Sequence, residues 1–216
     1  MDEEANSDPT CTPCPGGYYC DEKALTTAEL ILRGKYCDPG YYCTAGAETP
    51  YPTDGVKGDI CPAGHYCEGG NIEAAACDPG TYESRLGSYE CQDCPEGFYC
   101  EQATEEPIIC VNGFCPEKSA APSLCLDGTY ANETTTQLVS SDDCHVCPNG
   151  VFCKDGYVGG VIGTAIDSQA ALCDPGYFCD YGATSARDYE KICPIGHYCP
   201  RGTPLPIRCD LGLYNS

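Results

Sequence analysis

Hydrophobic residues in this chain occur in short, isolated groups rather than in long periodic stretches. Most groups are pairs that contain an aromatic residue and stand directly before a cysteine, as Tyr18 and Tyr19 do before Cys20. Pro, Asp and Gly, which favour turns, come just before each pair. Pairs of this kind predict extended segments of a few residues that leave a turn. We therefore expect a small, mostly irregular fold with short β-hairpins.

One seven-residue block repeats this pattern. Each copy has a cysteine, Pro or Asp, one residue, Gly, one residue, an aromatic residue and a second cysteine. Pro or Asp favours a turn, Gly supplies backbone freedom at its exit, and the ring packs with the disulfide as a miniature core. Copies occupy residues 14–20, 37–43, 61–67, 94–100, 147–153, 173–179 and 193–199, with a shortened copy at 110–115. The expected turn glycines are Gly16, Gly40, Gly64, Gly80, Gly97, Gly113, Gly128, Gly150, Gly176, Gly196 and Gly212.

A related block keeps the turn and a tyrosine but lacks the second cysteine. It begins at Cys77, Cys125 and Cys209, and we interpret each as the start of a repeat unit. The chain then divides into cysteine-rich units at 1–76, 77–124 and 125–208, with the start of a further unit at 209–216. The upstream half of the first loop is missing from unit 1–76. Tandem units that contact mainly their neighbours predict an elongated rod.

The chain has 22 cysteines, an even number that is typical of a disulfide scaffold. The unit-start cysteines are expected to pair across their own loops, Cys77 with Cys91 and Cys125 with Cys144. Cys11 and Cys209 are left over, and we expect their partners outside this sequence. The remaining cysteines pair within their units: Cys14, Cys20, Cys37, Cys43, Cys61 and Cys67; Cys94, Cys100, Cys110 and Cys115; Cys147, Cys153, Cys173, Cys179, Cys193 and Cys199.

The connectivity within each unit stays open, because four cysteines already allow three pairings. Within a unit we favour an alternating pattern, Cys94 with Cys110 and Cys100 with Cys115. One short helix is expected near residues 21–33. There, Leu25, Ala28 and Ile31 or Leu32 would share one face, and Gly34 would end the helix.

The composition indicates a domain stabilised by cross-links rather than a conventional domain with a large apolar core. Leu, Ile, Val and Phe make up about 15% of the chain, and the formal net charge is −22. Without cysteines such a chain would be disordered, because it buries too little apolar surface to offset its conformational entropy. Persistent disulfides require an oxidising compartment, so the protein is expected outside the cell or at the cell surface. The acidic charge argues against nucleic acid, and no apolar stretch is long enough for membrane insertion.

Candidate chemical sites are few. Three CxxC pairs, which begin at Cys11, Cys91 and Cys144, lack the spacing of a zinc ribbon and are interpreted as disulfide junctions. His65, His145 and His197 are interpreted as packing or surface residues. We expect no cofactor, no metal site and no enzyme, since no nucleophile is paired with a recurring base. Calcium binding has no motif to support it. Asn132 begins an Asn-Glu-Thr sequon in the loop between Cys125 and Cys144, so we expect N-glycosylation there.

The order of a CxxGTY block, a loop, CxxC and CPxGxYC resembles the ephrin-receptor-like cysteine-rich repeat, which is related to EGF-like and tumour-necrosis-factor-receptor modules. The resemblance covers nearly the whole chain. It implies a receptor ectodomain or a long extracellular array, as in surface and flagellar-hair (mastigoneme) proteins of protists and algae. We expect a structural segment of a filament or coat that associates with itself or with other extracellular proteins and glycans. The alternative is the ligand-binding ectodomain of a receptor or adhesion protein.

Overall fold

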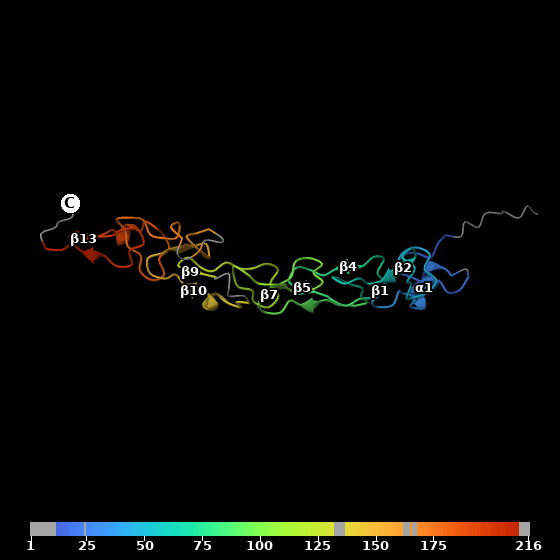
Figure 1. The fold of residues 1–216 in the computed structure, drawn as a ribbon. Coiled ribbons are helices and arrows are strands. Elements are labelled where there is room, and N and C mark those ends of the chain that lie inside the picture. The colour runs from blue at the N-terminus through green and yellow to red at the C-terminus, as the bar shows by residue number, and fades with distance from the viewer. Residues whose placement is uncertain (1–11, 24, 132–136, 162–164, 166–167, 212–216) are drawn as a thin grey trace, which may run out of the picture. The chain divides into compact units, whose positions relative to one another are not determined.

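The computed structural model describes residues 12–211, except 24, 132–136, 162–164 and 166–167. The chain divides into two compact parts. The first consists of Met1–Gln92 with Gln102–Glu106, and the second consists of Asp93–Glu101 with Pro107–Ser216. Most of the ribbon is loop, interrupted by very short strands (Figure 1). This confirms the expected fold of small disulfide-rich modules with short hairpins and little helix.

The first part contains the antiparallel hairpins β1–β2 and β3–β4, and its strand β5 pairs with β6. In the β1–β2 hairpin Tyr41 lies opposite Ile60, and in the β3–β4 hairpin His65 lies opposite Ala76. Each hairpin begins directly after a block turn, where the aromatic pair of the block supplies the first strand. The strands are β1 (Tyr41–Cys43), β2 (Gly58–Ile60), β3 (His65–Tyr66), β4 (Ala75–Ala76), β5 (Thr81–Tyr82) and β6 (Gln92–Asp93), which ends at the first residue of the second part.

The second part repeats the same arrangement. Its strands pair as antiparallel hairpins of two residues a side, with Phe98 opposite Ile109 and His197 opposite Arg208 as examples. The hairpins are β7 (Phe98–Tyr99) with β8 (Ile108–Ile109), β9 (Thr129–Tyr130) with β10 (His145–Val146), β11 (Cys153–Lys154) with β12 (Tyr157–Val158), and β13 (His197–Tyr198) with β14 (Ile207–Arg208). Two single turns of 3-10 helix lie at Ser141–Asp143 and Tyr189–Lys191.

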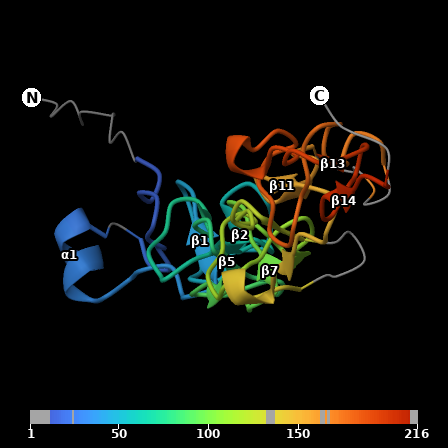
Figure 2. The ribbon, with the colours of Figure 1, turned by 90° about the vertical axis from the view of Figure 1, so that its left-hand side faces the viewer.

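The expected short helix is present as α1 (Thr27–Leu32), which projects from its part of the chain (Figure 2). Thr26 begins it with a capping box to Glu29, and Gly34 follows its end with a φ of 62°. The buried residue of the helix is Leu30, which is not among the residues expected to share one face, and Leu32 is 86% exposed. Since the cap places the first helical residue at Thr27, Leu25 lies outside the helix, and helical spacing from it does not apply.

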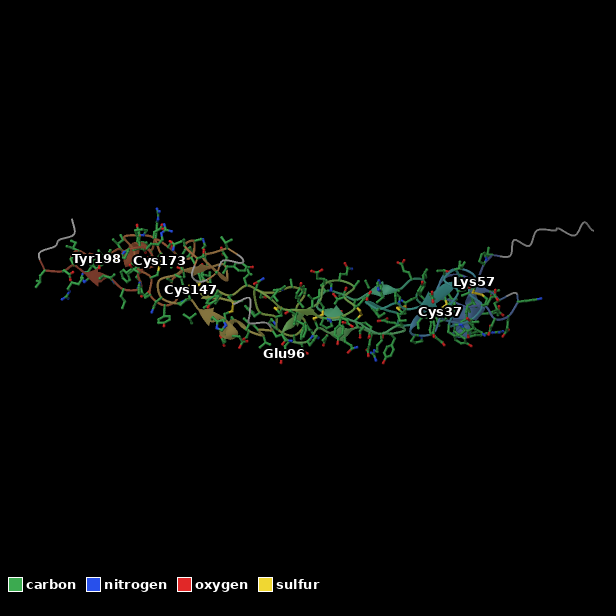
Figure 3. The ribbon with its side chains drawn as sticks, viewed as in Figure 1. Cys37, Lys57, Glu96, Cys147, Cys173 and Tyr198 are labelled. Atoms are coloured by element: carbon green, nitrogen blue, oxygen red, sulfur yellow. A yellow bond between two sulfur atoms is a disulfide. The ribbon has the colours of Figure 1, made fainter. Side chains whose placement is uncertain are left out.

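The core consists mainly of cysteine. Most disulfide cysteines are buried, while few aliphatic side chains larger than alanine are: Leu30 in the first part, and Leu138, Val151 and Val158 in the second. Figure 3 shows sulfur atoms within the loops and the carboxylate of Glu96 at the outside. Each part is thus stabilised by many small covalent clusters rather than by one apolar interior. The predicted unit boundaries, after residues 76, 124 and 208, stay a prediction.

Candidate functional site

The repeated block is the basic structural unit of this chain, and a disulfide within each seven-residue copy joins its two ends. In every seven-residue block the first cysteine is bonded to the last, with Cα atoms 5.7–6.2 Å apart. The bonds join Cys14 to Cys20, Cys37 to Cys43, Cys61 to Cys67, Cys94 to Cys100, Cys147 to Cys153, Cys173 to Cys179 and Cys193 to Cys199.

The alternating pattern favoured within a unit is therefore wrong. Cys94 is bonded to Cys100, and Cys110 is bonded to Cys115. The physical reason is the turn inside each block, which brings the two ends to a Cα separation of 5.9 Å and 6.1 Å respectively. That separation suits a disulfide without further movement of the backbone, so each block closes locally.

The remaining disulfides span the unit-start loops. Cys77 is bonded to Cys91 and Cys125 to Cys144, across 14 and 19 residues of sequence. Cys209 has no disulfide partner among the residues that the structure describes. Cys11 lies outside the described residues, and the expectation that both cysteines pair elsewhere stays a prediction.

A left-handed glycine sits at the same place in the turn of every seven-residue block. In the block from Cys173, Tyr177 donates its N–H to the carbonyl of Asp174 across the turn, and Gly176 has a φ of 88°. A type II turn requires such a φ at its third residue, where glycine is the least strained choice. Two expected positions need correction. Gly17 rather than Gly16 is left-handed in the first block, and in the shortened copy Asn112 takes this role in place of Gly113. Gly212 lies outside the described residues.

Backbone hydrogen bonds join many of the blocks to the next one. Gly150 donates its N–H to the carbonyl of Cys179 at 2.8 Å, and its own carbonyl accepts the N–H of Cys173 at 3.1 Å. The same pair of bonds joins Gly17 to Cys43 and Cys37, Gly40 to Cys67 and Cys61, Gly97 to Cys115 and Cys110, and Gly128 to Cys153 and Cys147. We call this repeated arrangement the block ladder. It ties consecutive blocks together through main-chain atoms that any sequence carries, so the side chains between the cysteines are free to vary.

The backbone of a turn later in the chain packs against each of these glycines, and we call this turn the covering turn. A Cβ atom on Gly150 would lie 2.6 Å from the carbonyl oxygen of Gly202, and one on Gly128 would lie 2.5 Å from that of Gly182. Gly87 covers Gly40 and Ala103 covers Gly64 in the same way. The covering residues are themselves left-handed. Glycine is therefore required for two reasons, its φ and the close approach of another backbone.

The CxxC pairs are junctions between disulfides. Cys91 and Cys94 belong to different disulfides, as do Cys144 and Cys147. Within the described part of the chain, no group of three or more His, Cys, Asp or Glu residues is placed to hold a metal ion. Such repeat modules are typical of non-catalytic extracellular proteins.

The three histidines lie in hairpin strands. The ring of His145 lies 5.6 Å from that of Tyr130 on the paired strand. His65 and His197 occupy equivalent block positions, and the Nδ1 atom of each lies near the carbonyl oxygen two residues earlier, at 3.1 Å and 3.3 Å. These contacts fit packing positions on the hairpins.

The surface hollow beside the β1–β2 hairpin has a volume of about 380 Å³, and its charged groups are already paired. Lys57 forms an ion pair with Glu48. Asp54 accepts the backbone N–H groups of Val56 and Lys57 at 2.9 Å and 2.7 Å. These hydrogen bonds lower the pKa of Asp54, first through Lys57 N–H and then through Val56 N–H. The charged groups here stabilise a loop, and the hollow contains no activated nucleophile.

Glu83 is the one fully buried carboxylate among the described residues. It lies in the loop closed by Cys77 and Cys91, and its side chain accepts hydrogen bonds from the backbone and guanidinium of Arg85 and from Gln92. Burial raises the pKa of Glu83, but hydrogen bonds, foremost those from Arg85, outweigh it and lower the pKa to about 2. Sequence reasoning missed this residue, because nothing in its spacing distinguishes it from the exposed glutamates.

The lowered pKa predicts that Glu83 makes stability depend on pH in the acid range. Its contribution is complete above the unfolded pKa of about 4.5 and is lost as the pH falls toward about 2. We expect Glu83→Gln to cost about 2 kcal/mol at neutral pH, the scale of a charged hydrogen bond. The difference from wild type should shrink at low pH in denaturant unfolding. Glu90→Gln, on the exposed side of the same loop, is the control and should change little; an equal effect would contradict this role for Glu83.

The predicted sequon at Asn132 lies outside the described residues, so glycosylation there stays a prediction. Among the described residues no helix is both long and apolar enough to cross a membrane. The disulfides place the chain in an oxidising, secreted or extracellular environment.

Comparison with known proteins agrees with the architecture. No protein-family model matches the chain. The chain is similar to cysteine repeat modular protein A of Toxoplasma gondii, with 25% identity over 200 residues that cover 86% of this chain. It spans only 5% of the length of that relative. The chain is thus a set of tandem cysteine-rich disulfide modules with distant similarity to a cysteine repeat protein, and the finer resemblance to ephrin-receptor-like repeats stays a prediction.

Proposed function

We propose that the chain is a structural segment of a secreted or cell-surface filament or coat, of the kind found in flagellar hairs. In this role the disulfide-stapled modules act as a stiff spacer. The segment supplies reach and resistance to proteolysis rather than catalysis. Its partners would be further copies of the same protein, or other extracellular structural proteins and glycans.

The block ladder is the observation that carries this proposal. It repeats from block to block through backbone atoms, in both parts of the chain. A module joined to its neighbours by main-chain bonds and closed by its own disulfide resists local opening, because each block would have to break bonds to two others. Such construction suits a mechanical role, and it leaves the side chains outside the blocks available for lateral contacts.

Exposed apolar and aromatic side chains support the idea of lateral contacts. In the first part, Tyr51, Tyr89 and Leu32 are exposed, and in the second part Tyr181 and Tyr189 are. Tyrosine suits both protein and glycan surfaces, since it offers an apolar ring with a polar end. The net charge of −22 opposes association of identical chains, and salt weakens that repulsion.

Electron microscopy and sedimentation of the native protein test the proposal. We expect regular polymers or end-to-end assemblies, with more assembly at high salt than at low salt, because screening reduces the repulsion between acidic chains. Monomers under all conditions would contradict it. If those monomers capture a defined protein or glycan, the receptor or adhesion ectodomain becomes the better description.

A further inference from the structure

We propose that Tyr18 and Tyr36 form a site of oxidative cross-linking, at which a peroxidase and hydrogen peroxide join the two rings by a carbon–carbon bond. We call these two residues the tyrosine pair. Both lie in the first part of the chain, Tyr18 in the block from Cys14 and Tyr36 directly before the block from Cys37. The inference does not depend on a role in a filament, because it concerns a modification within one chain.

The backbone places the two side chains of the tyrosine pair directly opposite each other. Tyr18 and Tyr36 form an isolated antiparallel β-bridge. Hydrogen bonds flank the bridge on both sides, and the one from the N–H of Cys37 to the carbonyl of Gly17 is 3.0 Å long. The two tyrosines are therefore a non-hydrogen-bonded pair, in which opposite side chains share one face and come closer than in the hydrogen-bonded kind.

The two rings are in contact and held in place. Their centroids are 4.9 Å apart and their planes are inclined by 33°, so the rings are closer to stacked than to perpendicular. Tyr36 also packs on the covering turn at Gly70, where a Cβ atom would lie 3.1 Å from Cδ1 of Tyr36. Burial, and then the hydrogen bond with Tyr36, raise the pKa of Tyr18. The hydroxyl groups thus meet as the rings do, and the pair is arranged for a reaction between its members.

The tyrosine pair is accessible to an oxidant from outside. Tyr36 is 43% exposed and Tyr18 is half-buried, so Tyr36 is the point of entry and the ring contact carries the oxidation on to Tyr18. The neighbouring Tyr19 is a poorer target. The Nζ atom of Lys35 lies 5.1 Å from its ring centroid, and a positive charge over a ring opposes the removal of an electron.

The composition leaves tyrosine as the main target of a one-electron oxidant. Thiols and thioethers are common targets of oxidation in proteins. This chain has one Met, no Trp and 17 Tyr. Its cysteines are mostly bonded in disulfides, and Cys209 is the free thiol among the described residues. Few other side chains therefore compete with the tyrosine pair for the oxidant.

The coupling balances with one molecule of hydrogen peroxide. The peroxidase uses the peroxide to remove one electron and one proton from each phenol, which breaks the two O–H bonds and leaves two phenoxyl radicals. Their unpaired electrons, shared with the ring carbons beside the hydroxyl groups, form a bond between one Cε atom of each ring. The two hydrogens on these carbons then move to the oxygens and restore both phenols. The O–O bond of the peroxide breaks and two water molecules form.

The new bond would add a kind of connection that the disulfides here do not provide. Cys14 is bonded to Cys20 and Cys37 to Cys43, so each disulfide closes one block on itself. The two blocks are otherwise joined by the hydrogen bonds of the block ladder. A bond between Tyr18 and Tyr36 would tie the first block covalently to the segment that enters the second, and it would survive reduction of the disulfides.

Treatment of the native, full-length protein with hydrogen peroxide and a haem peroxidase tests the proposal. The treated protein is reduced, alkylated and digested, and cross-linked peptides are identified by mass spectrometry. We expect a product that joins Tyr18 to Tyr36 and that has two hydrogen atoms fewer than its two peptides together. Its yield should not depend on the protein concentration, because two rings held in contact react within one molecule.

Tyr41 and Tyr51 form the internal control. Their rings meet edge to face with centroids 6.4 Å apart, and Tyr51 is 56% exposed, so the oxidant reaches this control at least as easily as it reaches Tyr36. We expect the yield from the tyrosine pair to exceed that from the control by at least about tenfold, because its rings are closer and more nearly stacked. Equal yields from the two pairs would overturn the proposal.

The variants Tyr18→Phe and Tyr36→Phe complete the experiment, since each keeps the ring and removes the hydroxyl group that must lose its hydrogen. Each should abolish the product, while mapping of the Cys14–Cys20 and Cys37–Cys43 disulfides confirms that the blocks still close. In the wild-type protein, coupling only between different copies, or oxidation of the tyrosine pair without a bond between its rings, would also overturn the proposal.

Discussion

Full reduction of the disulfides in the absence of denaturant is expected to unfold both parts of the chain. The disulfides close loops that the unfolded chain would otherwise sample freely, and each closure contributes roughly 2–3 kcal/mol on the chain-entropy model. The few buried aliphatic side chains cannot replace this stabilisation. We expect the near-UV tyrosine signal and the amide protection of all blocks to disappear together. Alkylation of the native protein without reduction is the control, and it should leave both signals unchanged.

A compact, protected fold after complete reduction would contradict the prediction. Paired substitutions test the same idea one loop at a time. Cys125→Ser with Cys144→Ser opens a loop of 19 residues, and Cys147→Ser with Cys153→Ser opens one of 6. On the chain-entropy model the longer loop should cost about 3 kcal/mol and the shorter one somewhat less, because closure entropy grows with loop length. The reverse order would show that packing around each disulfide outweighs loop entropy.

Gly150→Ala is expected to be strongly destabilising. Alanine in a left-handed conformation costs about 1–2 kcal/mol, and the new Cβ would lie 2.6 Å from the carbonyl oxygen of Gly202. Neither backbone can retreat without breaking the block ladder, so we expect a total cost of at least about 3 kcal/mol. The measurements are the yield of oxidised protein and the amide protection of the hydrogen bonds that Cys173 and Cys179 share with Gly150.

Gly34→Ala is the matched control for this experiment. Gly34 is also left-handed, with a φ of 62°, but a Cβ there would have nothing within 4 Å. The Gly34→Ala variant should lose only the conformational cost of a left-handed alanine, about 1–2 kcal/mol of stability. Equal effects at the two positions would mean that φ alone explains the turn glycines and that the covering turns contribute no steric constraint.

The sequence was enough to predict the fold class, most of the turn glycines and the short helix, because these depend on local chemistry. The spacing of Cys, Pro and Gly defines a turn within one block. The alternating pairing of Cys94, Cys100, Cys110 and Cys115 was predicted wrongly, because spacing alone does not state that a seven-residue turn brings Cys94 within reach of Cys100. The buried face of α1 was also missed, since it depends on where Thr26 begins the helix.

The block ladder and the covering turns could not be read from the sequence, because they involve backbone atoms that every residue carries. Gly87 and Gly40 lie far apart in the chain, and nothing in their types shows that one packs on the other. Glu83 is similar, since its burial follows from the path of the loop closed by Cys77 and Cys91. These features depend on tertiary contacts, whereas the block itself does not.

Local closure of the blocks has a consequence for synthesis in the secretory pathway. Because most disulfides join cysteines only five or six residues apart, a block can oxidise as soon as it leaves the translocation channel. The covering turn of each block arrives later, from the C-terminal side. Folding then advances from the N-terminus toward the C-terminus. At any moment, only the few cysteines made most recently still have free thiols that could form non-native disulfides.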